Sequence, residues 1–407
     1  MRAGNGARAG GFAGWWVELC FYDFGRKIMR VPTGCVCRMS KKHSLTLTVS
    51  LADQHFARAK SVGIFNLATG LARRLAGRAD LAALAVLGNR TLDSARFLPP
   101  VQFAKHDVAI AGRLARWWWD QWGVYAAAQR VGHEWLLLPK GFASFSRRPP
   151  VKLCAYVHDA MLDFYRRNHP GGFPKLEQIY FLRALRASIR HARIIFTNTE
   201  FTAREVQRVA AEAGLAAPIV ARAGIGFERA EFAASADRRG FVVLASSFPH
   251  KLTGRAVDWV ARWQLQTGFA EGVTWVGNLP RGLMLPTLAG WRQHGRLPEA
   301  EYRQVLRSAR GLVFFSEYEG FGMPPVEAVL GGVCPVYSEL PPTLEVMGGA
   351  GCGFANDDYE SFARAMNRAR EISPEQLARW AAELLARHNW DGVAERIMAG
   401  LQRADGS

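Results

Sequence analysis

The stretch SEYEGFGMPPVEAVLGG, residues 316–332, places two glutamates around a glycine-rich turn that leads into a helix. The run GLVFF before it (311–315) is short and rich in β-forming residues, as is typical of a strand buried in a parallel sheet. Pro324 and Pro325 suit the first helical positions, because the N–H that proline lacks would be unsatisfied there. The stretch therefore predicts a strand, a loop and a helix, which is the repeating unit of an α/β fold.

The same alternation of short apolar runs with helical periodicity extends along the chain. In the first half we expect strands over 45–51, 135–139, 152–159, 193–200 and 219–227, and helices over 66–76, 182–192 and 201–214. In the second half we expect strands over 240–247, 272–277, 310–317 and 333–338, and helices over 253–268, 298–309 and 324–332. Strands that alternate with helices form parallel sheets, so we expect two Rossmann-like domains in tandem.

Composition shifts suggest the domain boundaries. We expect an N-terminal extension over 1–43, disordered or the product of a mis-assigned start, because it lacks periodicity and Met39 opens a normal-looking beginning. A first domain over 44–227 and a second over 228–388 would meet at the polar stretch that follows residue 227. We expect 389–407 to form a C-terminal helix that packs back on the first domain.

The charge balance points to an anionic partner. The 407 residues carry a formal net charge of +17, which suits a phosphorylated ligand, an acidic membrane surface or nucleic acid, although arginine-rich codon usage explains it equally well. No apolar run approaches the roughly 18 residues of a membrane helix. The six cysteines are scattered, and Cys35 and Cys37 have no second pair to complete a zinc site. We therefore expect reduced thiols in a cytoplasmic protein.

The two glutamates of the opening stretch lie where a ligand would bind. In open α/β sheets, ligands bind outside the carboxyl ends of the strands, and a helix N-terminus there attracts phosphate. We place Glu319 in the loop and Glu327 in the first helical turn, so that they contact opposite ends of one extended ligand. Carboxylates accept hydrogen bonds from vicinal hydroxyls, which favours a sugar. Alternatively, Glu327 only complements the helix dipole and Glu319 is a solvated loop acid.

The segment EGFGMPPVEAVLGGVCPV (319–336) resembles the signature of retaining glycosyltransferases of the GT-B class, family 4, also called glycosyl transferases group 1. The resemblance implies a GT-B fold of two Rossmann-like domains that face each other across a cleft. It implies that Glu319 lies by the donor sugar, that Glu327 binds the ribose hydroxyls, and that the Gly-Phe-Gly backbone lines the sugar.

Other segments extend this resemblance over roughly residues 45 to 395. WRQHGRLPEAEYRQVLRSARGLVFFSEYEGFG resembles the region before the signature. FVVLASSFPHKLTGRAVDWV resembles the strand, lysine loop and helix that hold the diphosphate, which implies this role for Lys251. This chain departs from the family at two places. The family has glycine followed by threonine or arginine in place of Ser246 and Ser247, and asparagine in place of Leu252.

The first half resembles the family less closely. KLCAYVHDAM is similar to the segment that places a histidine, here His158, near the reacting sugar. KSVGIFNLATGLARRLA is similar to the glycine loop after the first strand, with Gly63 allowing close approach, although Phe65 and Asn66 replace the usual residues. RIIFTNTEFTAREV is similar to a strand-to-helix junction of the family; its Glu200 contacts the linker or caps the helix.

The resemblance thus implies a complete set of site residues. The implied catalytic residues are His158, Lys251 and Glu319, and the implied donor-binding residues are Gly63, Ser247, Lys251, Glu319, Gly320, Phe321, Gly322 and Glu327. We expect no metal site, since no Asp-x-Asp occurs in the chain, and no cofactor other than the donor, such as GDP-mannose or a UDP-sugar. Lys251 and the helix N-terminus would stabilise the leaving diphosphate instead.

The function that follows is metal-independent transfer of a hexose such as mannose, with retention, to a glycan or lipid-linked acceptor in polysaccharide biosynthesis. We expect a cytoplasmic location, or the inner face of the cytoplasmic membrane, with peripheral contact with anionic lipid. The cluster RWWWDQW (116–122) fits a membrane interface, sugar stacking or a core, and helical spacing of Trp118 and Trp122 favours core packing.

Two other classes of function remain open at this point. Another enzyme on the same scaffold, such as a nucleotide-sugar epimerase or a phosphorylase, would need its own acid/base carboxylates or a cofactor lysine, and neither signature is present. A basic nucleic-acid-binding protein would explain the charge but would lack a recognisable binding module, so we expect no nucleic-acid partner.

Overall fold

The computed structural model describes residues 45–53, 62–92, 94, 97, 99–106, 112–228 and 238–406. These residues belong to one compact unit, His43–Ser407. The expected N-terminal extension, the proposed start at Met39 and the Cys35–Cys37 pair lie outside the described residues, as does most of the predicted linker. None of the described helices combines the length and apolar character needed to cross a membrane.

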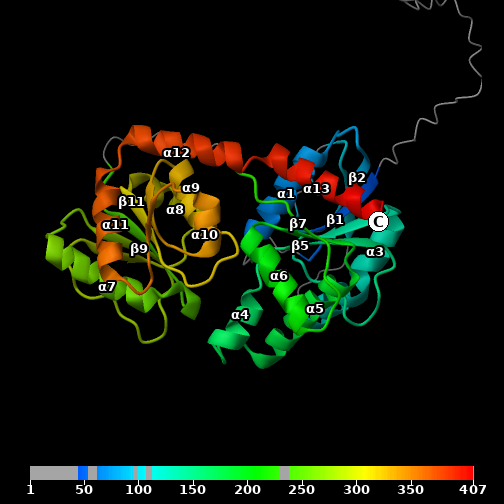
Figure 1. Ribbon diagram of the computed structural model, residues 1–407, viewed down its shortest axis with the longest axis horizontal. Coiled ribbons are helices and arrows are strands. Elements are labelled where there is room, and N and C mark those ends of the chain that lie inside the picture. Colours follow the sequence, from blue (N-terminus) through cyan, green and yellow to red (C-terminus); the bar gives the residue numbers. More distant parts are fainter. Residues whose placement is uncertain are drawn as a thin grey trace, which may run out of the picture. The chain divides into compact units, whose positions relative to one another are not determined.

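The first half forms a seven-stranded sheet in the order β3-β2-β1-β4-β5-β6-β7 (Figure 1). Its strands are β1 (Leu45–Ser50), β2 (Leu81–Asn89), β3 (Gln102–His106), β4 (Trp135–Leu138), β5 (Lys152–Val157), β6 (Ile194–Thr197) and β7 (Val220–Arg222). Every described pairing in it is parallel. The chain order reverses between β1 and β4, which makes the carboxyl ends of these two strands a topological switch point.

The second half forms a six-stranded sheet in the order β10-β9-β8-β11-β12-β13. Its strands are β8 (Phe241–Ala245), β9 (Val273–Gly277), β10 (Trp291–His294), β11 (Gly311–Phe314), β12 (Cys334–Ser338) and β13 (Cys352–Phe354). The described pairings are again parallel, and here the switch point lies between β8 and β11. The expectation of two parallel-sheet α/β domains is confirmed.

Helices connect most of the strands that follow one another in the chain, as is usual for parallel pairing; between β2 and β3 and between β9 and β10 the described residues form no α-helix. In the first half they are α1 (Val62–Leu75), α2 (Arg113–Trp118), the π-helix η3 (Trp119–Gly123), α3 (Val124–Val131), α4 (Met161–Asn168), α5 (Lys175–His191) and α6 (Glu200–Glu212). In the second half they are the 3₁₀ turn η4 (Pro249–Lys251), α7 (Thr253–Thr267), α8 (Glu299–Ser308), α9 (Met323–Leu330), α10 (Pro341–Met347), α11 (Tyr359–Glu371), α12 (Pro374–Arg387) and α13 (Trp390–Asp405).

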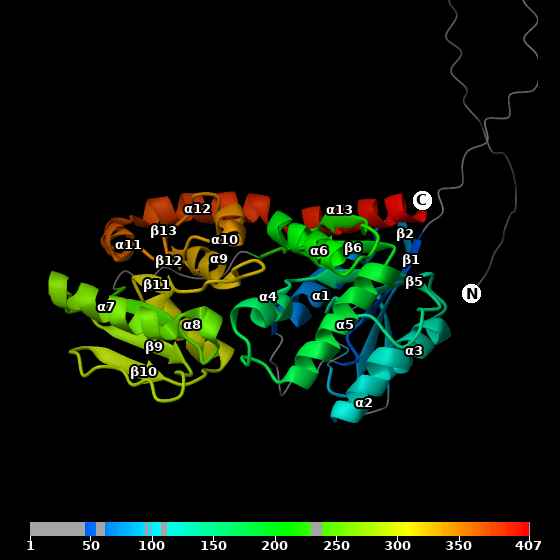
Figure 2. The same cartoon turned by 60° about the horizontal axis from the view of Figure 1, so that its bottom comes forward.

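The chain returns from the second sheet to the first between α12, which packs on α9, and α13. Figures 1 and 2 show α13 alongside α1, and it also packs against β6 and β7. The Trp390 ring lies so close to Gly70 that a Cβ there would come within 2.4 Å of it, and Gly400 approaches Phe196 in the same way. Buried aromatic and aliphatic side chains, Trp390 among them, fill the core between these elements.

Several expectations about local structure need correction. Helix α1 begins at Val62, so Gly63 lies in its first turn rather than in a loop. The strands β2, β3, β10 and β13 were not predicted. In β2, LAALAVLGN, three of the nine residues are alanine, which is depleted in strands, and the apolar run does not alternate with polar residues, so the strand signal is weak.

The tryptophan cluster also differs from its prediction. Trp118 is exposed and Trp122 half-buried, whereas Trp119 is buried in the core. The reason is the π-helical turn over Trp119–Gly123, which holds an extra residue and so rotates the side chains out of the spacing of an α-helix.

Candidate functional site

The loop after β11 packs tightly against the end of β5. A Cβ at Gly320 would lie 2.0 Å from the carbonyl oxygen of His158, so only glycine fits there. The Thr199 hydroxyl donates to the Gly320 carbonyl at 2.7 Å. The backbone amide of Ala160 donates to the Tyr318 hydroxyl at 2.9 Å. The glycine-rich turn therefore meets residues that follow a strand of the other sheet.

Helix α9 begins directly after this turn. Gly322 is its N-cap residue with φ of 85°, a left-handed conformation that favours glycine, and prolines occupy the first turn as expected. The helix begins at Met323, one residue earlier than predicted, so Glu327 lies in its second turn rather than its first. This correction moves the Glu327 carboxylate away from the free N–H groups of the helix end.

Lys251 and Glu319 form an ion pair at the switch point of the second sheet. Lys251 ends the 3₁₀ turn after β8, and Glu319 lies in the loop after β11. Their side chains are 22% and 12% exposed, respectively, and the ammonium nitrogen Nζ donates to Oε1 of Glu319. The Lys251 ammonium also lies 4.6 Å from the centre of the Phe314 ring. The sequence placed both residues in one site but not in contact with each other.

Glu327 faces different partners. Its burial and the nearby Glu299 carboxylate raise its pKa, while Arg303 lowers it. Burial followed by the Glu327 charge raises the pKa of Tyr302. These neighbours all belong to α8. The two glutamates of the signature therefore have separate surroundings, one beside Lys251 and the other beside α8.

His158 is a neutral imidazole at the end of β5. Its Nε2 lies 2.8 Å from the Pro139 carbonyl oxygen, which can only accept, so Nε2 carries the proton and Nδ1 is left as an acceptor. Burial lowers the pKa of His158 to about 4. Next to it, burial raises the pKa of Asp159; the Met161 amide and Lys251 oppose this, and Glu319 adds to it. Asp159 thus lies within electrostatic reach of the ion pair, and sequence reasoning did not assign it a role.

The remaining expected site residues have varied positions. Gly63 lies close to α9, since a Cβ on it would be 3.4 Å from the Met323 sulfur. Ser247 is exposed in the bend before η4. The Phe321 side chain is buried and stacks on Phe227 with ring centres 5.9 Å apart, so it anchors the loop to the core. Only the backbone at Phe321 remains available to a ligand.

Additional polar contacts join the two sheets near the site. The Tyr165 hydroxyl lies 2.6 Å from Nδ1 of His250, and His169 forms a hydrogen bond with Glu317. The Glu200 amide donates to the Glu345 carboxylate at 2.9 Å. The capping role expected of Glu200 was wrong, because the N-cap of α6 is the preceding residue, Thr199. No short stretch of sequence predicts contacts between residues so far apart in the chain.

The switch point of the first sheet holds a second ion pair. Asp53 follows β1 and Lys140 follows β4, and the Lys140 ammonium donates to the Asp53 carboxylate. Burial and the Asp53 charge raise the pKa of the neighbouring Asp120 to about 6, while its hydrogen bond from Tyr180 opposes that rise. Sequence reasoning did not select these residues, although Asp53 and Lys140 each follow a predicted strand.

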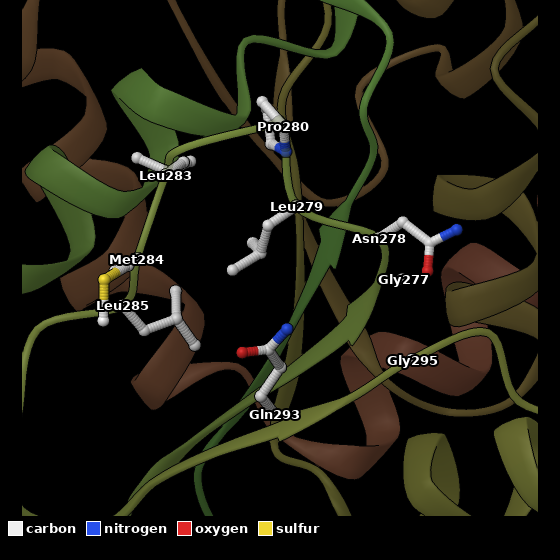
Figure 3. A pocket seen from close by; sticks show the side chains of 9 residues that line it. All are labelled: Gly277, Asn278, Leu279, Pro280, Leu283, Met284, Leu285, Gln293 and Gly295. Atoms are coloured by element: carbon white, nitrogen blue, oxygen red, sulfur yellow. The ribbon is translucent and has the colours of Figure 1, made fainter.

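A cavity of about 490 Å³ opens at the carboxyl ends of β9 and β10 (Figure 3). Leu279, Leu285 and Gln293 point toward its interior, and its remaining lining residues are Gly277, Asn278, Pro280, Leu283, Met284 and Gly295. It lies along the same sheet edge as the loops of Lys251 and Glu319, because the strand order is β10-β9-β8-β11. The sequence carries a signal for this cavity in the Asn-Leu-Pro-Arg-Gly loop (278–282), which directly follows a predicted strand.

Within the described residues, no group of three histidine, cysteine, aspartate or glutamate side chains is placed to hold a metal ion. The expectation of a metal-independent site stays a prediction.

Comparison with known proteins gives a match to a protein family and matches to the folds of solved structures. Residues 289–383 match the family described as Glycosyl transferases group 1, and this segment includes both Glu319 and Glu327. No curated protein shows a significant match to the chain.

Solved structures resemble the fold over most of its length. The HepE protein of Anabaena, in complex with UDP and glucose, has 16% identity and a TM-score of 0.59, covering 88% of this chain and 100% of that one. The sucrose-phosphate synthase of Thermosynechococcus elongatus has 14% identity and a TM-score of 0.62, covering 89% and 99%. A trehalose-6-phosphate protein of E. coli bound with UDP-2-fluoro glucose has 10% identity and a TM-score of 0.60, covering 88% and 99%. The fold is that of the GT-B glycosyltransferases, as predicted.

Proposed function

We propose that the protein is a glycosyltransferase of the GT-B type that transfers a hexose from a nucleotide-diphosphate sugar to a glycan or lipid-linked acceptor. The observation that carries this proposal is the Lys251–Glu319 ion pair at the switch point of the second sheet. A cation and an acid held there match the two ends of a sugar diphosphate. The matched family segment and the UDP-bound structural neighbours add support.

The donor would extend along the carboxyl edge of the second sheet. The cavity at β9 and β10 has room for a nucleoside; the next position along the edge is the Lys251 loop, which would meet the diphosphate. Glu319, one strand further, would then meet the sugar. Glu327, beside α8, would accept hydrogen bonds from the ribose. The proposed positions of the nucleoside, the diphosphate and the sugar follow the strand order, whereas the proposed role of Glu327 rests on its position beside α8.

Lys251 has two partners in this arrangement. A phosphate of the donor would compete with the Glu319 carboxylate for the Lys251 ammonium group. The positive charge of this ammonium would stabilise the departing diphosphate. Glu319, once released from Lys251, would be free to accept hydrogen bonds from the hexose.

His158 would position the donor sugar and would not act as an acid or a base. With a pKa near 4 it is neutral at physiological pH, and its Nε2 proton is held by the Pro139 carbonyl. Its Nδ1 can accept a hydrogen bond from a hydroxyl group of the sugar. We propose that the acceptor's proton goes to the leaving phosphate oxygen, with retention of configuration and without a metal ion. The family resemblance motivates this stereochemistry.

The acceptor would approach from the first sheet. Asp53 and Lys140 lie at its switch point and offer a carboxylate and an ammonium to acceptor hydroxyls. A hexose such as mannose, with GDP-mannose or a UDP-sugar as donor, fits the expectation from the sequence. A lipid-linked acceptor in polysaccharide biosynthesis would bring the protein to a membrane surface.

A thermal-shift screen tests the proposal. UDP or GDP should raise the melting temperature by mass action, whereas a single- or double-stranded oligonucleotide should not. Donor-hydrolysis assays over a panel of nucleotide sugars would then identify the base and the hexose. Stabilisation by oligonucleotides alone would reject the glycosyltransferase function in favour of nucleic-acid binding.

A further inference from the structure

The structure leaves an apolar surface uncovered on α2 and the first turns of α5. Leu114, Trp117 and Trp118 share one face of α2 and are 82%, 41% and 49% exposed, respectively. On α5, Leu176 is 82% exposed and Ile179 is 48% exposed. These five residues, called here the tryptophan patch, are half of the ten exposed large apolar side chains in the part of the chain that the structure describes.

The two helices hold this patch together. Arg113 on α2 and Glu177 on α5 form an ion pair at 3.6 Å, and the Tyr180 hydroxyl donates to Asp120 at 2.7 Å. Figure 2 shows α2 beside the N-terminal end of α5. The five exposed apolar side chains therefore lie on two neighbouring helices.

A row of cations continues the patch along α5. After Leu176 and Ile179, the same helix face exposes Arg183, Arg186 and Arg190 at spacings of three and four residues. Within the described chain, no carboxylate forms an ion pair with these three arginines. The exposed face of α5 is thus apolar at its start and positively charged over the rest; the three arginines are called here the cationic row.

We propose that the tryptophan patch and the cationic row dock the protein on an anionic phospholipid surface. Tryptophan and leucine side chains favour the boundary between head groups and acyl chains, and arginines beside them attract anionic head groups. Tryptophan and arginine are also common in protein interfaces; the arrangement that favours lipid is an apolar start followed by a uniformly positive remainder on one helix face. The lipid contact concerns a surface apart from the Lys251–Glu319 site and does not depend on the proposed transfer activity.

Vesicle sedimentation with the full chain tests this proposal. The protein should sediment with vesicles of phosphatidylcholine and phosphatidylglycerol in equal amounts, and at least about tenfold less with phosphatidylcholine alone. The Arg183→Glu/Arg186→Glu variant should weaken binding to the mixed vesicles by at least about tenfold, because each arginine near the surface contributes to the attraction. Added salt should weaken binding of the wild type.

The tryptophans allow a direct readout of insertion. Brominated phosphatidylcholine in the mixed vesicles should quench part of the tryptophan fluorescence, and this quenching should disappear in Trp117→Ser/Trp118→Ser. Leu265→Ser on α7 is the matched apolar control, because Leu265 is 70% exposed away from the patch. Arg379→Glu/Arg403→Glu on α12 and α13 is the matched charge control. Both controls should bind like the wild type.

Three results would overturn the proposal. One is equal binding to anionic and neutral vesicles, or none to either. Another is wild-type binding by both patch variants, with melting temperatures that show intact folds. The third is a wild-type oligomer that dissociates in Trp117→Ser/Trp118→Ser without any change in vesicle binding, which would assign the patch to contacts between copies. If the tryptophan variant fails to fold, Leu114→Ser/Leu176→Ser takes its place.

Discussion

At the scale of single residues, Lys251 is held between an acid and an aromatic ring. Its ammonium pairs with Glu319 and lies over Phe314. Asp159, with its raised pKa, is close enough to interact with both charges. In the proposed function, this half-buried cation would stabilise the leaving diphosphate.

Lys251→Ala should slow transfer at least about tenfold, because one charge-assisted contact to a leaving phosphate is worth roughly 1.5–3 kcal/mol. Steady-state kinetics with the identified donor measure this effect. Arg403→Ala, an exposed position on α13, is the control and should leave the rate unchanged. An unaltered rate in a folded Lys251→Ala variant would remove Lys251 from the site.

The two glutamates should fail in different ways. Glu327→Gln should mainly weaken binding of the nucleoside diphosphate. The carboxylate would accept hydrogen bonds from two ribose hydroxyls, and the amide that replaces it is a poorer acceptor. Glu319→Gln should not weaken that binding, because it removes the carboxylate that competes with phosphate for Lys251. It should lower turnover, because the proposed contact of Glu319 is with the transferred hexose. Calorimetry with the diphosphate and steady-state kinetics separate the two effects.

The opposite pattern, with nucleotide binding lost only in Glu319→Gln, would reverse the assignment of the two ends. If neither change affects binding or rate, the proposed function itself fails.

At the scale of elements, the junction of η4 and α7 carries backbone strain. Leu252 caps the 3₁₀ turn with φ of 48° and ψ of 33°, the left-handed conformation, and is the sole non-glycine residue with positive φ in the described part. Such a conformation costs an ordinary L-residue roughly 1–2 kcal/mol, whereas asparagine tolerates it. The departure from asparagine in the family therefore falls on a strained position directly beside Lys251.

Replacing Leu252 should reveal this strain. Leu252→Val should lower the free energy of unfolding by about 1–2 kcal/mol, because a β-branched side chain tolerates positive φ least. Leu252→Asn should be more stable than the valine variant, although it loses half-buried packing against the core. Urea denaturation measures both. Equal stability of the two variants would contradict the strain argument.

The same 3₁₀ turn holds a buried histidine. Burial lowers the pKa of His250 from 6.5 to about 3, with smaller contributions from Lys251 and His169. Above pH 6.5 both the folded and the unfolded states are neutral at this position. Below it, the unfolded state binds a proton that the folded state does not, so the free energy of unfolding falls as the pH drops from 6.5 toward 3.

His250→Asn should flatten this dependence. The wild type should lose up to about 2 kcal/mol at this residue between about pH 7 and pH 5. The variant should lack that loss, although it should be less stable at neutral pH because the bond with Tyr165 is weakened. Urea denaturation across the pH range checks the slope, with His294→Asn as control. An identical slope in wild type and His250→Asn would disprove the assignment.

At the scale of the whole molecule, an acid from the second half caps a helix of the first. Glu345 on α10 accepts hydrogen bonds from the amides of Glu200 and Phe201 at the start of α6, and pairs with Arg222 at 3.0 Å. The carboxylate thus meets free N–H groups and the positive end of the helix dipole.

Glu345→Ala should lower the free energy of unfolding by about 1–2 kcal/mol, as loss of a helix cap does. Thermal and urea unfolding measure the change. Glu360→Ala is the matched control, since Glu360 is an exposed acid whose one ion pair among the described residues is with Arg262 at 3.5 Å. A loss no larger than that of the control would show that the cap contributes nothing.

The sequence alone determined the features that depend on neighbours in the chain. The strand before Glu319, the prolines that open α9 and the alternation of elements all arise from turn chemistry and periodicity within a few residues. Both parallel sheets and the placement of Glu319 and Lys251 near one sheet edge followed from these patterns and the family resemblance. The alanine-rich β2 was missed because its local signal is weak.

Only the tertiary structure decided which side chains meet. Lys251 and Glu319 are 68 residues apart and pair because the strand order sets β8 beside β11. Asp159 comes within electrostatic reach of that pair because the loop after β11 packs, at Gly320, against the residues that follow β5. Trp119 is buried and Trp118 exposed because a π-helical turn changes the spacing. Contacts across sheets and between distant loops are selected by the packing of the whole chain, and no short window of sequence contains them.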